Sequence, residues 1–283
     1  MKIRLAVFFI SFCVVGGLIF FQFIQHSDKR LHVYFCDVGQ GDGILMRTPQ
    51  GLDILVDAGP NDKILDCLSK HMPLWDREIE LAFATHPDAD HIGGYRYILK
   101  GYRIKQFNIP KKDSKTGIFK SLMRELKDDH IPVRYLVYGD KYITPDGIVL
   151  ATFWPTQEFV SQNMASESTN SFSLVQLISY GKFTMLLTGD IEKERLHTIF
   201  PNGLSVDIFK LPHHGSKTGA DDSTFQLVKS KLDILSVGLR NRYNHPSPVI
   251  LELLKTYSVP FFRTDEKGDI EIVTAGETFF VRD

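Results

Sequence analysis

The segment Ala84–Gly94 reads ATHPDADHIGG and places four side chains that commonly bind metal ions within a few residues of each other. His86 and Asp88 follow an apolar run and are two residues apart, so an extended backbone projects both to one side. Asp90 and His91 come next, where a helix is expected to begin. Imidazole and carboxylate ligands together suit one or two divalent transition ions. The alternative is a helix cap, in which one aspartate accepts hydrogen bonds from free backbone amides.

Three other strand-like runs also end in polar residues, namely Asp57, Asp190 and the pair His213 and His214. In layered α/β proteins, ligands bind beyond the carboxyl ends of the strands. Each residue has an alternative explanation, since Asp57 can cap a turn and Asp190 the following helix. One of the two adjacent histidines can equally be a core residue. Taken together with ATHPDADHIGG, the four strand ends predict one shared metal site.

The elements that must position these residues alternate between strand-like and helix-like along the chain. Helices are predicted over Asp62–His71, Ser114–Asp129 and Asp221–Lys231, and a polar loop over Thr156–Thr169. This alternation predicts an α/β fold with two sheets sandwiched between helices. The chain has 283 residues, 43% of them hydrophobic, which is ample for such a core. We expect residues 31–283 to form one domain.

The N-terminal segment differs from the rest of the chain. Residues 5–24 carry no charge and are about long enough to cross a bilayer as a helix. Lys2 and Arg4 precede this segment, which favours a cytoplasmic N-terminus. We therefore predict that residues 1–30 form a transmembrane anchor, with a single pass through the cytoplasmic membrane and the hydrolase domain outside it. The alternative is a buried hairpin helix of a soluble protein.

Charge and cysteine content add little about partners. The formal net charge is −1, so there is no global electrostatic argument for nucleic acid. Lysines cluster before and within the helix near residue 115, although such runs are usually solvated surface. Cys36 and Cys67 can pair in an oxidising compartment, but no pattern defines the required geometry, and we interpret both as buried thiols.

Several motifs resemble one known family. THPDADHIGG, LLTGD, FKLPHHGSKT and SVGLRNRYNHPSP are similar to metallo-β-lactamase motifs, and DVGQGDGILMRTPQG followed by VDAG matches the start of such a domain. The set resembles the C-terminal hydrolase domain of ComEC/Rec2 competence proteins. The resemblance implies a four-layer αββα sandwich and a centre with two divalent metal ions, manganese or zinc. It also implies DNA as a partner and a role in DNA uptake during competence, and it names no protein partner.

The resemblance assigns a role to each matching position. His86 and Asp88 would hold one metal, Asp90 and His91 the other, and Asp190 would bridge them. One of His213 and His214 would complete the site, and Asp57 would orient ligands from behind.

Two positions depart from the wider family. Asp88 replaces the usual histidine, which makes the site harder and favours manganese. The wider family also has a third-motif histidine, which precedes the bridging aspartate in the sequence, and this chain lacks it. The corresponding region reads STNSFSLV and offers Asn170 as a supporting residue.

The implied reaction is hydrolysis of a phosphodiester, with Asp90, Asp190 and His245 as catalytic residues. Substrate contacts are predicted for Lys217, Arg242 and Tyr243. For His245 the alternative is a structural role, because HPSP is a good helix start. Two rival functions remain open: a hydrolase of small esters, lactones or β-lactams, and a catalytically weak DNA-binding accessory of an uptake machine.

Overall fold

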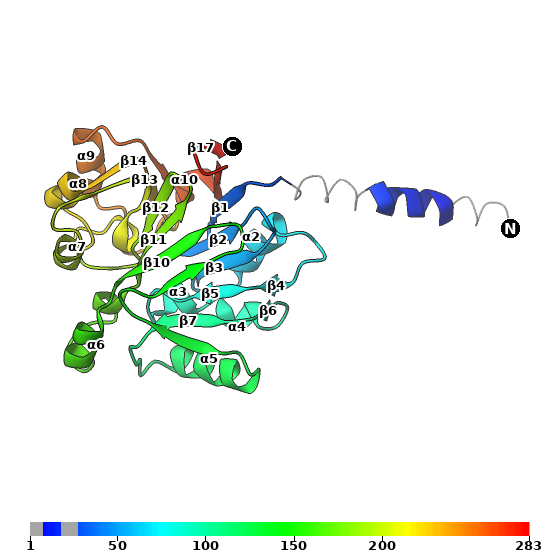
Figure 1. The fold of residues 1–283 in the computed structure, drawn as a ribbon, viewed down its shortest axis with the longest axis horizontal. Coiled ribbons are helices and arrows are strands. Elements are labelled where there is room, and N and C mark those ends of the chain that lie inside the picture. Colours follow the sequence, from blue (N-terminus) through cyan, green and yellow to red (C-terminus); the bar gives the residue numbers. More distant parts are fainter. Residues whose placement is uncertain (1–7, 18–27, 283) are drawn as a thin grey trace.

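Two large sheets form the centre of the molecule (Figure 1). The computed structural model describes residues 8–17 and 28–282. In this part of the chain one sheet has eight strands, in the order β17-β16-β1-β2-β3-β5-β7-β8. Their bounds are β17 (Phe279–Arg282), β16 (Ile270–Thr274), β1 (Leu31–Phe35), β2 (Gly43–Arg47), β3 (Asp53–Ala58), β5 (Leu81–Phe83), β7 (Phe107–Pro110) and β8 (Val133–Leu136).

The second sheet has seven strands among the described residues, in the order β15-β14-β13-β12-β11-β10-β9. They are β15 (Phe261–Arg263), β14 (Val228–Leu235), β13 (Leu204–Lys210), β12 (Phe183–Leu187), β11 (Val175–Tyr180), β10 (Val149–Trp154) and β9 (Lys141–Ile143). A small extra ladder joins β4 (Glu78–Ile79) to β6 (Arg103–Ile104). Strands β3, β5, β7 and β8 are mutually parallel, as are β12 to β15. Their carboxyl ends therefore meet at one edge of each sheet.

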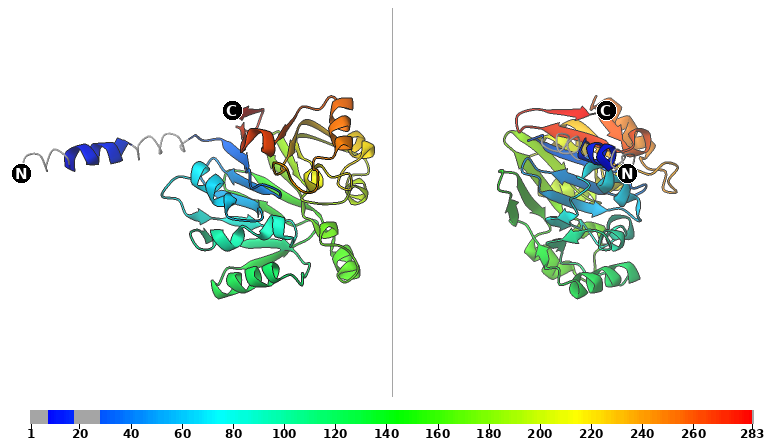
Figure 2. Two further views of the ribbon diagram at one scale, coloured as in Figure 1. Left: turned by 180° about the vertical axis from the view of Figure 1, so that it is seen from behind. Right: turned by 90° about the vertical axis from the view of Figure 1, so that its right-hand side faces the viewer.

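Helices cover the outer face of each sheet (Figure 2). The first sheet is covered by α2 (Lys63–His71), α3 (Ala89–Ile92), α4 (Tyr95–Ile98) and α5 (Gly117–Asp128), whose buried side chains share one core with it. The second is covered by α6 (Gln157–Asn163), α7 (Lys193–Ile199), α8 (Asp222–Leu227) and α9 (Pro248–Thr256). A third core of residues from both sheets lies between them. The αββα prediction is therefore confirmed. The remaining short helices are α10 (Thr264–Lys267), η1 (Asn170–Phe172) and η2 (Pro212–Gly215).

Local sequence explains where two of the helices begin, α5 and α6. The α5 helix starts after Thr116, whose hydroxyl accepts a hydrogen bond from the Phe119 amide. The predicted polar loop over Thr156–Thr169 contains α6, which Thr156 caps in the same way. Phe159 and Val160 of α6 are buried, so tertiary packing stabilises a helix that its polar composition obscured.

The helix predicted over Asp221–Lys231 is too long. It ends at Leu227, and the chain continues directly into β14. Val228 pairs in parallel register with Leu204 of β13, and the ladder continues to Ile234 opposite Lys210. A ladder of this kind satisfies backbone groups through a neighbouring strand, which a local helical pattern does not reveal.

The prediction of a membrane anchor over residues 5–24 is wrong on the part of the chain that can be described. No helix within residues 8–17 and 28–282 is long and apolar enough to cross a membrane. Residues 8–17 are helical. The other residues of 5–24 lie outside the described residues. The predicted localisation, with a single pass through the cytoplasmic membrane, is therefore not supported by the described residues.

Cys36 and Cys67 form a disulfide and are not the buried thiols expected from sequence. Cys36 directly follows β1, and Cys67 lies on the buried face of α2. Packing of α2 on the sheet brings their Cα atoms to 5.8 Å, which lies within the range a disulfide requires.

Candidate metal centre

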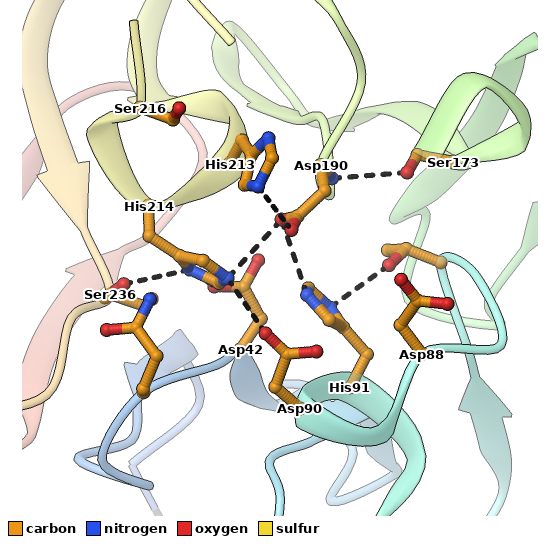
Figure 3. A network of polar contacts seen from close by, with 12 residues as sticks. Asp42, Asp88, Asp90, His91, Ser173, Asp190, His213, His214, Ser216 and Ser236 are labelled. Atoms are coloured by element: carbon orange, nitrogen blue, oxygen red, sulfur yellow. Dashed lines mark hydrogen bonds and ion pairs between the residues drawn. The ribbon is translucent and has the colours of Figure 1, made fainter. Parts of the chain in front are cut away.

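The predicted metal ligands converge beyond the carboxyl ends of β3, β5, β12 and β13 (Figure 3). One ligand atom from each of four residues lies within 4.8 Å of the others, and the four residues are Asp90, His91, Asp190 and His214. Asp90 and His91 lie in α3, which follows β5, Asp190 lies in the loop after β12, and His214 lies in η2, which follows β13. Segments that are about a hundred residues apart in sequence therefore meet because the two sheets face each other.

Asp190 occupies the middle of this cluster. Its Oδ1 lies 3.3 Å from His91 Nε2 and 3.5 Å from His214 Nε2, and its Oδ2 lies 3.6 Å from His213 Nε2. The Asp190 amide donates to Ser173 Oγ, which holds the loop after β12 in place. Helix α7 begins only at Lys193, after Glu192, so Asp190 is not its N-cap. A carboxylate that faces three imidazoles in this way has the geometry of a bridging ligand.

His91 is supported from behind by Asp57. The Nδ1–H of His91 can donate to Asp57 Oδ2 at 2.8 Å, which leaves Nε2 facing Asp190. Asp57 also accepts hydrogen bonds from the amide and hydroxyl of Thr85, both at 2.7 Å. All three side chains are buried. This matches the orienting role that the family resemblance gave to Asp57, because a ligand histidine usually donates its other nitrogen to a carboxylate.

His214 is supported by a different set of residues. Its Nδ1 lies 3.0 Å from the Ser236 carbonyl oxygen and 3.3 Å from Asp42 Oδ1. Its Nε2 lies 3.6 Å from Asp90 Oδ2 and 3.5 Å from Asp190 Oδ1. Lys210 Nζ in turn contacts Asp42 Oδ1 at 2.9 Å, although both side chains are buried. His214 is therefore the member of the histidine pair that joins the four-residue cluster.

His86 and Asp88 lie on the other side of His91. The His86 and His91 rings are 4.1 Å apart, and His86 Nε2 lies 3.7 Å from Asp88 Oδ2. Asp88 is the N-cap residue of α3 by position, but its side chain makes no capping hydrogen bond. The capping alternative therefore does not account for Asp88. Its carboxylate is partly exposed, in contrast to the buried His86.

The glycine pair that ends ATHPDADHIGG has a steric reason. A Cβ on Gly93 would lie 2.3 Å from the Pro60 oxygen, and one on Gly94 would lie 1.9 Å from the Ala58 oxygen. Helices α3 and α4 therefore pack directly on the end of β3 and the turn that follows it. Asp57 lies near that end of β3. Only glycine permits that approach, and it brings His91 within reach of Asp57.

Three residues of the site have left-handed backbones although they are not glycine. The φ angles of Asp57, His213 and His214 are 59°, 51° and 55°. Such conformations are uncommon for residues with a side chain and persist where the surrounding structure holds them. Here they turn three polar side chains toward the same small volume.

Electrostatics reinforce the grouping. Burial would lower the pKa of His91, but the carboxylates of Asp190 and Asp57 outweigh it and raise that pKa. Burial would likewise lower the pKa of His214, but Asp190 and Asp42 outweigh it and raise that pKa. Burial would raise the pKa of Asp190, but His214 and His91 lower it well below its usual value. Asp190 is therefore ionised at neutral pH, as a metal ligand must be.

The donor set fits a divalent metal. His86 Nε2, His91 Nε2, His214 Nε2 and Asp190 Oδ1 are all buried without a hydrogen-bond partner among the described residues. Leaving buried polar atoms unpaired is costly unless something else satisfies them. Nitrogen and carboxylate ligands of this kind suit zinc, manganese or iron.

The other predicted site residues lie around this cluster. The His245 ring meets the His213 ring edge to face at 5.9 Å and stacks on Tyr243 at 5.8 Å. The Arg242 side chain is exposed and donates to the Tyr243 hydroxyl. Lys217 is exposed in the loop after η2. Asn170 lies in η1, and the contact from this region to Asp190 comes from Ser173 instead.

Sequence reasoning missed Asp42 and Lys210. Asp42 lies in DVGQGDG, which contributed to the family resemblance but gave Asp42 no role, and Lys210 ends a strand whose other residues are mostly apolar. A charged residue at the end of a buried strand, next to a histidine pair, was the available signal. Nothing in the local sequence showed that the two would meet.

Histidines and aspartates at the strand ends of an αββα sandwich define a class of metal-dependent hydrolases. The chain belongs to the metallo-beta-lactamase superfamily, whose family model matches residues 36–238. Among curated proteins it is similar to ComE operon protein 3 of Bacillus subtilis, at 28% identity over 92% of this chain and 35% of that protein. It is equally similar to recombination protein 2 of Haemophilus influenzae, at 28% identity over 88% of this chain and 30% of that protein. The chain thus spans about a third of these relatives.

Solved structures share the fold at low sequence identity. YhfI of Bacillus subtilis, a metallo-beta-lactamase fold protein, aligns with a TM-score of 0.52 and 12% identity over 89% of this chain and 99% of YhfI. Zinc-bound PqqB of Methylobacterium extorquens aligns with a TM-score of 0.51 and 12% identity over 79% and 85%. CmlA of Streptomyces venezuelae, a diiron β-hydroxylase, aligns with a TM-score of 0.53 and 13% identity over 83% of this chain and 53% of CmlA. These likenesses show the fold alone.

Proposed function

We propose that this chain is a phosphodiesterase that uses two divalent metal ions, manganese or zinc, to cleave DNA. The observation that carries the proposal is the cluster of Asp90, His91, Asp190 and His214. In it, His91 Nε2, His214 Nε2 and Asp190 Oδ1 are buried without a hydrogen-bond partner among the described residues. His86 and Asp88 beside it would hold the second ion, and Asp190 would bridge both. Similarity to two competence-type relatives supports DNA as the substrate class and DNA uptake as the setting.

The chemistry of the metals would be to activate a water molecule and to neutralise charge on the phosphate. The residues of this chain have separate tasks. Asp57 and Asp42 hold His91 and His214 with Nε2 toward the site. Asp90, which is partly exposed, would accept a proton from the attacking water at its carboxylate.

His245 would contribute as a neutral imidazole. Burial, followed by the nearby His214 and His213, lowers the pKa of His245 to about 4. A neutral ring can donate a hydrogen bond from N–H to a phosphate oxygen, but it holds no extra proton for the leaving group. Arg242, Tyr243 and Lys217 would contact the substrate from the exposed loops nearby.

The carboxylate of Asp88 favours this reaction over hydrolysis of a lactam or lactone. A site with more carboxylate ligands is harder and suits manganese and phosphate oxygens. The segment around Asn170 contains no histidine to replace the missing third-motif ligand, so the ion at His86 and Asp88 would have fewer protein ligands.

The test uses metal-depleted full-length protein, reloaded with manganese or zinc. End-labelled DNA and a chromogenic cephalosporin are supplied as alternative substrates. We expect metal-dependent DNA cleavage that Asp90→Ala abolishes, with Asp128→Asn on exposed α5 as the matched control. Cleavage that survives both chelation and Asp90→Ala would contradict the mechanism. DNA binding without turnover in any metal would favour the accessory function, and turnover of the cephalosporin alone would favour the small-molecule hydrolase.

A further inference from the structure

A buried ion pair lies behind His214. Lys210 is the last residue of β13 and is fully buried, and its ammonium lies 2.9 Å from Asp42 Oδ1. The same ammonium donates to the Leu211 carbonyl at 3.1 Å. Asp42 is 1% exposed and lies 3.3 Å from His214 Nδ1. A buried lysine that faces a buried aspartate is costly to desolvate and is weak evidence for stability alone, so its place beside a candidate metal ligand needs explanation.

The loop that carries Asp42 is held on several sides. The Asp42 carbonyl accepts from the Gly59 amide at 2.7 Å, which ties it to the turn after Asp57. A Cβ on Gly41, whose φ is 133°, would lie 2.0 Å from the Asp90 carbonyl oxygen. Gln40 Oε1 accepts from the Gly238 amide at 3.2 Å. The loop therefore contacts three site segments, and the Asp42 carboxylate has little freedom to move.

We propose that Lys210 and Asp42 are positioning residues that act through His214 and set the metal affinity of the half-site formed by Asp90, His91, Asp190 and His214. The Ser236 carbonyl accepts from His214 Nδ1–H and the Asp42 carboxylate lies 3.3 Å from the same nitrogen, which leaves the Nε2 lone pair facing the metal site. Lys210 holds the Asp42 carboxylate in place beside the His214 ring. This inference rests on the proposed metal-dependent function, but it concerns metal binding and not the substrate.

The support of His91 shows why the lysine matters. Asp57 receives two hydrogen bonds from Thr85 in addition to His91. Within the described part of the chain, the Asp42 carboxylate has no such pair of neutral donors, and Lys210 takes their place. The fixed carboxylate of Asp42 therefore orients the His214 ring from behind, as Asp57 orients His91.

The experiment measures zinc affinity of the full-length protein by calorimetry, with far-UV circular dichroism and thermal melting to verify folding. The main variant is Asp42→Asn/Lys210→Met, which removes both charges together and leaves no unpaired buried ion. We expect zinc to bind about ten- to a hundred-fold more weakly at the half-site formed by Asp90, His91, Asp190 and His214. In a His214→Ala background, the same double change should have no further effect, because the pair acts through that imidazole.

The matched control is the ion pair of Asp207 and Lys231, which joins β13 to β14 at 2.7 Å away from the cluster. Asp207→Asn/Lys231→Met should leave zinc affinity unchanged. A second variant, Asp42→Glu, keeps the charge opposite Lys210 but displaces the carboxylate. It should weaken zinc binding while melting close to the wild type, which keeps the test valid if the double variant fails to fold.

Three outcomes would overturn the inference. The first is unchanged zinc affinity in folded variants, and the second is that the double change weakens zinc binding equally in the His214→Ala background. The third is that the wild type binds no zinc. If the wild type binds zinc but cleaves no DNA, only the proposed function fails. If DNA is cleaved but substitution of Asp42 does not change zinc affinity, only the positioning role fails.

Discussion

The two ends of strand β3 carry buried aspartates with different surroundings. Asp53 begins the strand and Asp57 lies near its end, and both are fully buried. Asp53 forms an ion pair with Arg47, and its amide donates to Glu80. Asp57 accepts from Thr85 and His91 at the edge where the candidate ligands gather. One end therefore belongs to the scaffold and the other to the metal centre.

The charge state of buried carboxylates differs between the same two edges. Burial raises the pKa of Asp53 to about 8, because the opposing effect of Arg47 is too small and Asp76 and Glu80 add to the rise. At the site edge, burial acts in the same direction on Asp190, but two imidazoles reverse it. Burial alone thus makes a carboxyl group neutral, and only converging positive partners keep it ionised as a ligand.

The largest expected effect is that of Asp190→Asn. Because Asp190 faces His91, His213 and His214, the change removes the central negative charge of the cluster. We expect turnover of DNA to fall by about three orders of magnitude, with weaker zinc binding. Steady-state kinetics and calorimetry measure the two effects. Near-normal turnover in a folded variant would remove Asp190 from the centre.

The next largest loss of DNA turnover is expected for substitutions of the histidine pair, His213 and His214. His214 is buried within the four-residue cluster, whereas His213 is partly exposed, lies outside that cluster and contacts Asp190 at 3.6 Å. We expect His214→Ala to reduce turnover about a hundred-fold and His213→Ala about ten-fold. Both variants are assayed at saturating metal with the same substrate. The reverse order would assign the metal to His213.

Asp57→Asn should have a moderate effect. The amide still fills the space but no longer offers a charged acceptor to His91 Nδ1–H. We expect zinc affinity to fall about ten-fold or somewhat more, in the range known for residues behind metal ligands. Asp53→Asn, at the other end of the same strand, is the control and should leave zinc affinity unchanged. A loss in both variants would indicate general disturbance of β3.

The smallest effect concerns stability and pH at Asp53. Its pKa is about 8 in the folded protein and near 3.8 when unfolded, so the folded state binds more protons between these values. The free energy of unfolding therefore falls as pH rises through that window, by about 1–3 kcal/mol between pH 5 and 7 from this residue. Urea unfolding at several pH values should show the wild-type fall and a smaller one in Asp53→Asn. Identical pH profiles would contradict the assigned pKa.

Much of this architecture could be predicted from the sequence. Alternating apolar runs predicted the layers, and the spacing of His86, Asp88, Asp90 and His91 indicated metal chemistry. The family resemblance of these motifs is confirmed. The failures have physical reasons. Strand β14 depends on pairing with β13, α6 on burial of two residues, and the disulfide on packing of α2 against the first sheet.

The sequence by itself determined the types of ligand and the strands that carry them, because periodicity and short-range spacing are local properties. Only the tertiary structure decided which residues face one another. It selected His214 over His213 for the four-residue cluster, and it brought Lys210 to Asp42 across a long separation in the chain. The reason is that the orientation of a side chain at a strand end depends on the loops packed around it. Those contacts form only when the two sheets come together.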